Sequence, residues 1–211
     1  MNETLKRTLS GTLYVLIMWI GTSYSQTSFR ILFMLIFVVC LYEMWKLRKN
    51  KTKFIALLYI TIPFILIHTL DNNSVNNSFD PTIILLIYIL TWTFDTFGYI
   101  FGVKFGKHKI MPNISPKKSW EGFIGGYVST IIAAFSFNFF FMTIDLLQVI
   151  IISLFLPFTA TIGDFIESYY KRKAGVKDSG NFIPGHGGML DRIDAFTITI
   201  PILYIYINLI R

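Results

Sequence analysis

Acidic side chains occur in this sequence at positions where the surrounding residues are strongly apolar. Five of them lie on or beside apolar segments: Asp95, Asp164, Glu167, Asp191 and Asp194. An ionisable group at membrane depth is costly, so it normally faces a water-filled cavity and marks a functional site. One helical face carries Asp164, Glu167, Ser168 and Lys171, at the spacing i, i+3, i+4, i+7. A salt-bridged stripe would explain Lys171 beside Glu167, but not four acids at one boundary.

Clustered carboxylates repel one another and resist ionisation, and a divalent cation removes that conflict. Mg²⁺ takes one or two carboxylates together with phosphate oxygens of a substrate. Lys and Arg side chains then neutralise phosphate oxygens that the cation does not reach. Zinc is disfavoured, because three scattered histidines and the single Cys40 offer no ligand cluster. The acids and bases therefore indicate a magnesium–phosphate site. For Asp95 alone, a helix–helix hydrogen bond is the competing interpretation.

The loop between the last two apolar segments is rich in glycine. Its glycines are Gly175, Gly180, Gly185, Gly187 and Gly188. Glycine permits tight turns and lets backbone N–H groups approach an anion closely. Such a loop is a weak signal alone. Here basic residues precede it and the sequence Asp-Arg-Ile-Asp follows it at 191–194, which favours phosphate binding.

With these residues in view, the sequence resembles the phosphatidate cytidylyltransferases, or CDP-diacylglycerol synthases. One block reads Gly163-Asp164-Phe165-Ile166-Glu167-Ser168, Lys171-Arg172, Lys177-Asp178, Pro184-Gly185-His186-Gly187-Gly188 and Asp191-Arg192-Ile193-Asp194. Another reads Asp95-Thr96-Phe97-Gly98-Tyr99, Gly102, Gly106-Lys107 and Ile114-Ser115-Pro116-Lys117-Lys118-Ser119-Trp120-Glu121-Gly122. The resemblance covers about residues 91–126 and 157–196, and the chain looks shorter than typical bacterial members.

The resemblance implies a role for each matching residue. Asp164 and Asp191 would be the principal Mg²⁺ ligands, with Asp194 as a third ligand or a partner of the ligands. A second cation stays open. The implied catalytic residues are Asp164, Lys171, Asp191 and Asp194. The implied substrate-binding residues are Asp95, Lys117, Lys118, Glu121, Ser168, Arg172, Lys177, Asp178, His186 and Arg192. Among these, Asp95 ranks lower, and His186 is expected mainly to shape its loop.

The activity that the resemblance implies is transfer of the cytidylyl group of CTP to phosphatidate, giving CDP-diacylglycerol and pyrophosphate in phospholipid biosynthesis. The implied partners are CTP, phosphatidate in the membrane leaflet and the lipid bilayer, with a homodimer left open. One alternative is a CTP-dependent transferase or kinase acting on another lipid, such as an ether-lipid phosphate or a polyprenol. An ion-coupled transporter is a weaker alternative, because its acids should be spread across the membrane depth.

The elements that must position these residues are apolar helices. Hydrophobic residues make up 54% of the 211 residues and charged residues 15%, against about 25% charged in soluble domains. Residues 8–29, 122–144 and 146–163 contain no Asp, Glu, Lys or Arg, and about 20 apolar residues cross a bilayer as one helix. The sequence predicts an all-α, polytopic membrane bundle of about seven spans: 9–25, 30–46, 54–70, 82–103, 121–142, 146–168 and 193–210. Residues 1–80 are expected to form N-terminal spans and 81–211 a catalytic membrane domain.

Basic residues are distributed unevenly between the predicted spans. Loops 104–120 and 171–192 and segment 46–53 are basic, whereas segment 71–81 has no Lys or Arg. Basic loops favour the cytoplasm, so the site is expected to face the cytoplasm from the inner (plasma) membrane of a bacterium. The same rule accounts for the net charge of +7 without nucleic acid. The N-terminus also has features of a secretion signal, with Lys6 and Arg7 before an apolar stretch, but a retained first span is the simpler interpretation.

Overall fold

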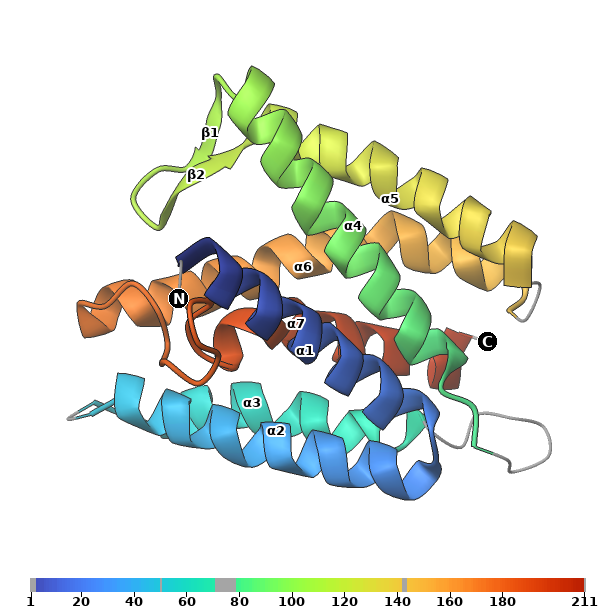
Figure 1. The fold of residues 1–211 in the computed structure, drawn as a ribbon, viewed down its shortest axis with the longest axis horizontal. Helices are drawn as coiled ribbons and strands as arrows, with labels where there is room; N and C mark the ends of the chain where they lie inside the picture. Colours follow the sequence, from blue (N-terminus) through green and yellow to red (C-terminus); the bar gives the residue numbers. More distant parts are fainter. Residues whose placement is uncertain (1–2, 50, 71–78, 142–143, 211) are drawn as a thin grey trace.

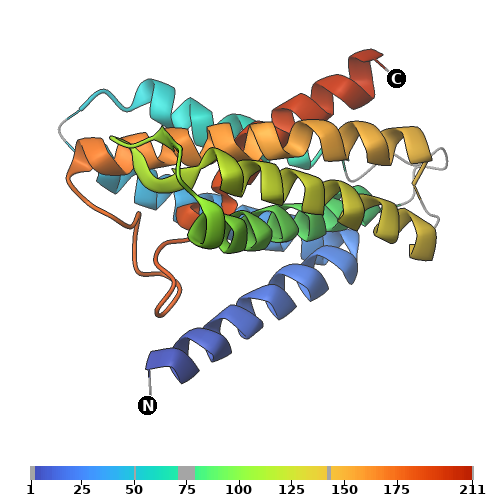
Figure 2. The same ribbon diagram turned by 90° about the horizontal axis from the view of Figure 1, so that it is seen from above.

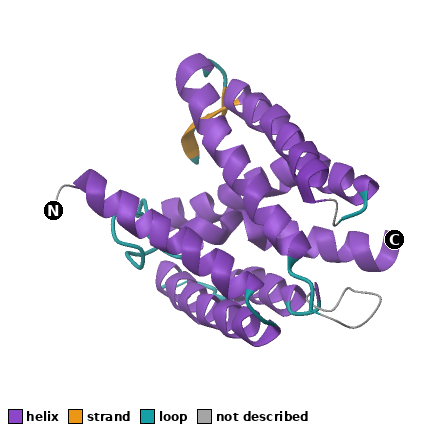
Figure 3. Cartoon of the chain, turned by 45° about the vertical axis from the view of Figure 1, so that its right-hand side comes forward, coloured by secondary structure: helices purple, strands orange, loops and turns teal. Residues whose placement is uncertain are grey.

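The computed structural model describes residues 3–49, 51–70, 79–141 and 144–210. Within them, seven α-helices follow one another: α1 (Glu3–Ser23), α2 (Gln26–Leu47), α3 (Phe54–Ile67), α4 (Thr82–Phe105), α5 (Trp120–Phe141), α6 (Leu146–Ala174) and α7 (Leu190–Ile205). A π-helical segment, Tyr206–Ile210, continues α7. Helix dominates the chain (Figure 3), which confirms the predicted all-α bundle. Most of segment 71–81, which lacks Lys and Arg, lies outside the described residues.

The seven helices coincide with the seven predicted spans, but they differ in length and polarity. Among the described residues, α2, α4, α5 and α6 are long enough and apolar enough to cross a membrane. Helix α3 has 14 residues, so at about 1.5 Å per residue it is shorter than the hydrocarbon core of a typical bilayer. Helix α1 begins with the polar sequence Glu-Thr-Leu-Lys-Arg-Thr. The number of membrane crossings therefore stays a prediction.

A short β-hairpin interrupts the basic loop between α4 and α5, which the sequence analysis did not anticipate. Strands β1 (Lys109–Met111) and β2 (Ser115–Ser119) pair antiparallel, with Lys109 opposite Ser119. Strands this short offer no alternation of apolar and polar residues from which they could be predicted. The hairpin folds back over the end of α4 (Figure 1), so Lys117 and Lys118 are held on a strand rather than on a free loop.

Helices α6 and α7 lie at the centre of the bundle (Figure 1). Helices α4 and α5 pack on one side of them and α2 and α3 on the other. One core of buried apolar side chains joins all seven helices, including Phe29, Tyr88, Leu156 and Leu203. Figure 2 shows that α1 diverges from the bundle toward its N-terminus. The loop between α6 and α7 extends out to meet it, through a hydrogen bond from Ser10 to the carbonyl of Pro184 (2.7 Å).

Glycine allows α4 and α5 to approach closely. The carbonyl oxygen of Gly98 lies where a side chain on Gly122 would have to sit, and a Cβ on Gly126 would come 2.8 Å from the carbonyl oxygen of Phe94. Small residues are the usual means by which membrane helices bring their backbones together. Gly98 and Gly102 on α4 therefore lie in a close backbone contact with Gly122 on α5.

Replacing Gly126 with valine should destabilise the bundle, because both the backbone and the ring of Phe94 occupy the space that the new side chain needs. We expect a loss of about 1–3 kcal/mol in the free energy of unfolding, measured as thermal unfolding in detergent. Val128→Ile on the exposed face of the same helix is the control and should change little. Equal stability of the two variants would contradict this packing.

Candidate active site

The residues of the two sequence blocks meet at one end of the bundle. The end of α6, the start of α7 and the β-hairpin all lie there (Figure 1), together with the end of α2. The glycine-rich loop of residues 175–189 joins α6 to α7 at this end. Helix α6 stops at Gly175, which has a φ of +73° and accepts the left-handed conformation that ends a helix. The chain thus turns directly from the basic end of α6 into the loop.

Lys171 is shared between two carboxylates in a largely buried position. Its Nζ lies 2.5 Å from Oε2 of Glu167, one turn earlier on α6, and 2.8 Å from Oδ1 of Asp191 on α7. The Glu167 side chain is fully buried and that of Asp191 is 7% exposed. Removing one member of a buried ion pair leaves an uncompensated charge, which is strongly destabilising. The triad therefore fixes α6 and α7 at a defined separation.

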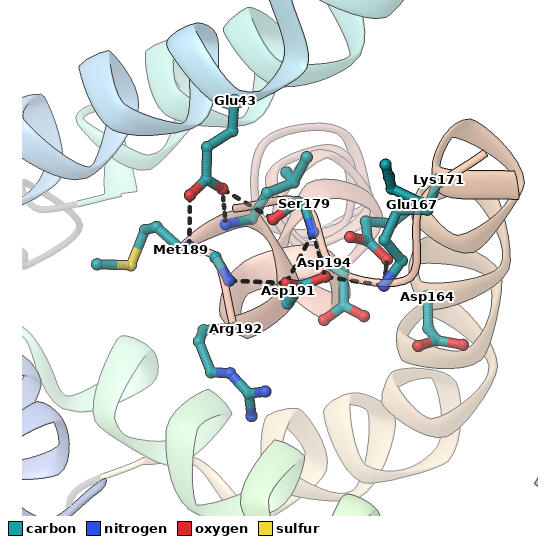
Figure 4. A network of polar contacts seen from close by, with 12 residues as sticks. Glu43, Asp164, Glu167, Lys171, Ser179, Met189, Asp191, Arg192 and Asp194 are labelled. Carbon is teal, nitrogen blue, oxygen red and sulfur yellow. Dashed lines mark hydrogen bonds and ion pairs between the residues drawn. The ribbon is translucent and has the colours of Figure 1, made fainter. Parts of the chain in front are cut away.

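Asp191 also organises the loop that precedes it (Figure 4). Its carboxylate accepts hydrogen bonds from the backbone N–H groups of Ser179 (3.0 Å) and Gly188 (2.8 Å). Gly187, at a φ of +89°, packs so closely that a Cβ would come 2.8 Å from Oδ2 of Asp191. Both oxygens of Asp191 are thus engaged by Lys171 and by loop amides, and its prediction as an Mg²⁺ ligand stays a prediction.

Asp164 pairs with the β-hairpin rather than with α7. Its Oδ2 lies 2.9 Å from Nζ of Lys118 on β2. The charge of Asp164 acts on both Asp95 and Asp194, and that of Asp95 also acts on Asp194. The charge of Lys118 acts on Asp95 and Asp194 as well. Figure 4 shows Asp164 and Asp194 turned to the side of the network away from Glu43. Three acids from three helices therefore converge near one lysine.

A cavity of about 570 Å³ opens beside this cluster, between α4, α5 and the hairpin. A ligand pocket typically has a volume of several hundred Å³. The walls of the cavity carry Asp95 from α4 and Lys117, Lys118 and Ser119 from β2. Gly98, Gly102 and Gly106 also line it, so the α4 glycines both pack the helix and leave room for a ligand. Three predicted site residues of the block that begins at Asp95, namely Asp95, Lys117 and Lys118, thus line one cavity.

Several other predicted site residues shape the loops. Arg172 donates to the carbonyls of Ile114 (3.3 Å) and Val176 (3.0 Å), which links α6 to the hairpin. His186 contacts Ser10 on α1 through Nδ1 (3.0 Å), and Arg192 donates to its carbonyl (2.6 Å). His186 thus joins the loop to α1, and its predicted part in substrate binding stays a prediction.

Glu121 accepts from the backbone N–H groups of Lys107 (3.1 Å) and His108 (3.2 Å), which closes the base of the hairpin. Ser168 is buried on α6, whereas Lys177 and Asp178 are exposed on the loop. The substrate contacts expected for these residues stay predictions.

Glu43 is a member of the network that the sequence analysis missed. It lies near the end of α2, is 4% exposed and accepts a hydrogen bond from Ser179. From the sequence, residues 1–80 are expected to form N-terminal spans, and every predicted site residue lies beyond them. The signal was available, since Glu43 is an acid within an apolar segment, as are the five acids chosen above.

The acids around Lys118 have the chemistry that magnesium prefers, although the described residues include no group of three or more His, Cys, Asp or Glu close enough to hold an ion as they stand. Within the described residues, Oδ2 of Asp164 is buried and makes no well-aligned hydrogen bond, so it relies on the charge of Lys118. Carboxylate oxygens with little other bonding suit a hard cation. Mg²⁺ binding by Asp164 and Asp194, with Asp95 nearby, stays a prediction.

Comparison with known proteins gives one consistent family. The profile described as "Cytidylyltransferase family" matches residues 54–210, which extends the similarity upstream to α3. The phosphatidate cytidylyltransferase of Rickettsia bellii is 37% identical over 213 residues, covering 96% of this chain and 89% of that protein. That of Thermotoga maritima is 44% identical over 165 residues, covering 74% of this chain and 58% of that protein.

The phosphatidate cytidylyltransferase of Staphylococcus haemolyticus is 43% identical over 123 residues, covering 58% of this chain and 47% of that protein. The match thus spans about half of the Thermotoga and Staphylococcus proteins and most of the Rickettsia protein. The part of this chain that the family profile matches includes the α6–α7 loop, the β-hairpin and the acids beside them. Because the family profile and these relatives agree, we conclude that the chain belongs to the cytidylyltransferase family.

Proposed function

We propose that this protein transfers the cytidylyl group of CTP to phosphatidate. An oxygen of the lipid phosphate attacks the α-phosphorus of CTP and forms a new P–O bond. The bond from the α-phosphorus to the bridging oxygen of the β-phosphate breaks, and pyrophosphate leaves with that electron pair. The products are CDP-diacylglycerol and pyrophosphate.

The main obstacle to this reaction is charge rather than proton transfer. A phosphate monoester has a second pKa near about 6, so it is largely dianionic at neutral pH and needs no dedicated base. Two anions must nevertheless meet, and positioning with electrostatic stabilisation has to supply the catalysis. Lys117 and Lys118 on the wall of the cavity provide cationic groups suited to phosphate oxygens.

The observation that carries the proposal is the Lys118–Asp164 ion pair, on the side of the cavity where Asp95 and Asp194 converge. A phosphate group entering with a divalent cation would offer each partner a new contact: the lysine would bind phosphate, and the carboxylate would bind the cation. Asp164 and Asp194 would hold Mg²⁺, which when bound would neutralise charge on the triphosphate. Lys171 and the loop amides would keep α7, and hence Asp194, in place.

The position of the site suits one substrate from water and one from the bilayer. The cavity lies at the end of the bundle that carries the basic loops, and α4 and α5 beside it are long and apolar. We place this end on the cytoplasmic side of a bacterial inner membrane. CTP would reach the cavity from the cytoplasm, and phosphatidate would reach it laterally from the leaflet.

Replacing Asp164 with asparagine keeps the side-chain shape but removes the charge that pairs with Lys118. We expect kcat for CDP-lipid formation to fall about 100-fold or more, because several kcal/mol of charge stabilisation would be lost. Asp145→Asn, at the opposite end of α6, is the matched control and should keep activity within about twofold of the unaltered protein. Full turnover in the Asp164 variant would refute its assigned role.

Chelation should abolish the reaction reversibly. Purified protein with CTP and phosphatidate is expected to release pyrophosphate in Mg²⁺ and to stop in EDTA, with recovery on adding excess Mg²⁺. Ether-lipid phosphate and polyprenol serve as comparison substrates, since a polyprenol kinase would release CDP without pyrophosphate. Undiminished pyrophosphate release in EDTA would exclude the divalent-cation mechanism.

The orientation of the bundle can be tested with reporter fusions. A reporter placed after Lys173, at the end of α6, should read cytoplasmic, because the surrounding loop is basic. A reporter at residue 76 should read external. The opposite pattern would place the site outside the cell, where CTP does not reach it, and would contradict the proposal.

A further inference from the structure

Glu43 connects the N-terminal part of the chain to the start of α7. It comes from the last turns of α2, and its side chain is almost completely buried. Its carboxylate accepts hydrogen bonds from Oγ of Ser179 (2.9 Å) and from the backbone N–H groups of Met189 (3.1 Å) and Leu190 (2.8 Å). All three donors belong to the loop or to the first residue of α7. The contact therefore spans about two thirds of the chain.

Helix α7 begins without a local cap. Met189 occupies the capping position, and its side chain makes no capping hydrogen bond within the described part of the chain. The first N–H groups of a helix lack partners within the helix and require an acceptor. A carboxylate is well suited, because it also interacts favourably with the positive end of the helix dipole. Glu43 supplies this acceptor from α2.

Two carboxylates divide the amides at this junction (Figure 4). The N–H of Gly188 donates to Asp191, while the next two N–H groups donate to Glu43. Ser179 joins the two, since its N–H binds Asp191 and its hydroxyl binds Glu43. The backbone N–H groups at the start of α7 are thus bound by two carboxylates: Asp191 from α7 itself and Glu43 from α2.

The loop is shaped to accept the Glu43 carboxylate. A Cβ added to Gly180 or Gly188 would collide with the oxygens of Glu43. Glycine at these two positions therefore does more than permit turns, because it lets the loop backbone close around a buried acid. The loop backbone and the Glu43 carboxylate from α2 thus fit closely against each other.

We propose that Glu43 is a positioning residue of the active site: it caps α7 from α2 and so sets the direction in which Asp191 and Asp194 enter the site. The inference rests on the proposed function for its kinetic readout, and on the hydrogen bonds above for its structural readout. It makes α2 part of the catalytic framework rather than a membrane anchor alone.

The test compares Glu43→Gln and Glu43→Ala with a matched control. Glutamine keeps the size of the side chain but has one acceptor oxygen where the two backbone N–H groups now use two. Alanine removes both. Asp80→Asn is the control, because Asp80 also accepts a backbone N–H at a helix start, from Thr82 of α4 (3.0 Å), outside the α7 junction. Ser179→Ala removes only the hydroxyl that donates to Glu43.

We expect kcat to fall about tenfold in Glu43→Gln and about 100-fold in Glu43→Ala, with KM for CTP within about threefold, because unsatisfied amides would let the start of α7 shift. Hydrogen exchange at the amides of Met189 and Leu190 should accelerate in the same order. Asp80→Asn should change none of these quantities, and Ser179→Ala should resemble the glutamine variant.

Three results would overturn the inference. One is unchanged exchange at Met189 and Leu190 in Glu43→Ala. Another is a lowered melting temperature with unaltered kcat in the folded protein, which would reduce Glu43 to a role in stability. The third, if the alanine variant fails to fold, is full kcat in both Glu43→Gln and Ser179→Ala. An unaltered protein that forms no CDP-lipid would refute the proposed function instead, and the exchange measurement would still decide the role of Glu43.

Discussion

The arrangement of this molecule depends on compensating buried charge in an apolar bundle. Lys171 lies between Glu167 and Asp191, so one ammonium group is shared by carboxylates from the two central helices. Because any single member left alone would be costly in this setting, the helices are constrained to one mutual position. Asp164 and Lys118 extend the same principle to the β-hairpin. The geometry of the candidate site thus follows from neutralising charge where water is scarce.

Buried polar contacts also join parts of the chain that are distant in sequence. The predicted division at residue 80 separates N-terminal spans from a catalytic membrane domain, yet Glu43 on α2 and Tyr59 on α3 both contact residues beyond it. Tyr59 donates to the carbonyl of Gly163 (3.2 Å) and accepts from Thr197 (2.5 Å), which joins α3 to α6 and α7. The family profile, which begins at residue 54, agrees with including α3 in the functional unit.

The helices could be predicted from the sequence because long apolar runs free of charge have few alternatives in a membrane protein. The grouping of Glu167, Lys171 and Asp191 could be expected in part, since helical spacing places the first two side by side. The hairpin could not be predicted, because its strands are too short to show a period. The ion pair between Asp164 and Lys118 depends on how that hairpin folds back. The hydrogen bond from α7 to Glu43 depends on tertiary packing between distant segments.

As one of the predicted spans, helix α3 would have a consequence for the lipid around the protein. Its 14 residues reach only about 21 Å, well short of the hydrocarbon thickness of about 30 Å. Such hydrophobic mismatch is met by local thinning of the bilayer or by flanking polar groups that reach outward. Lipids beside α3 would then compress their tails and carry their headgroups deeper than elsewhere. Because α3 packs directly on α7, this thinning would occur beside the helix that carries Asp191 and Asp194.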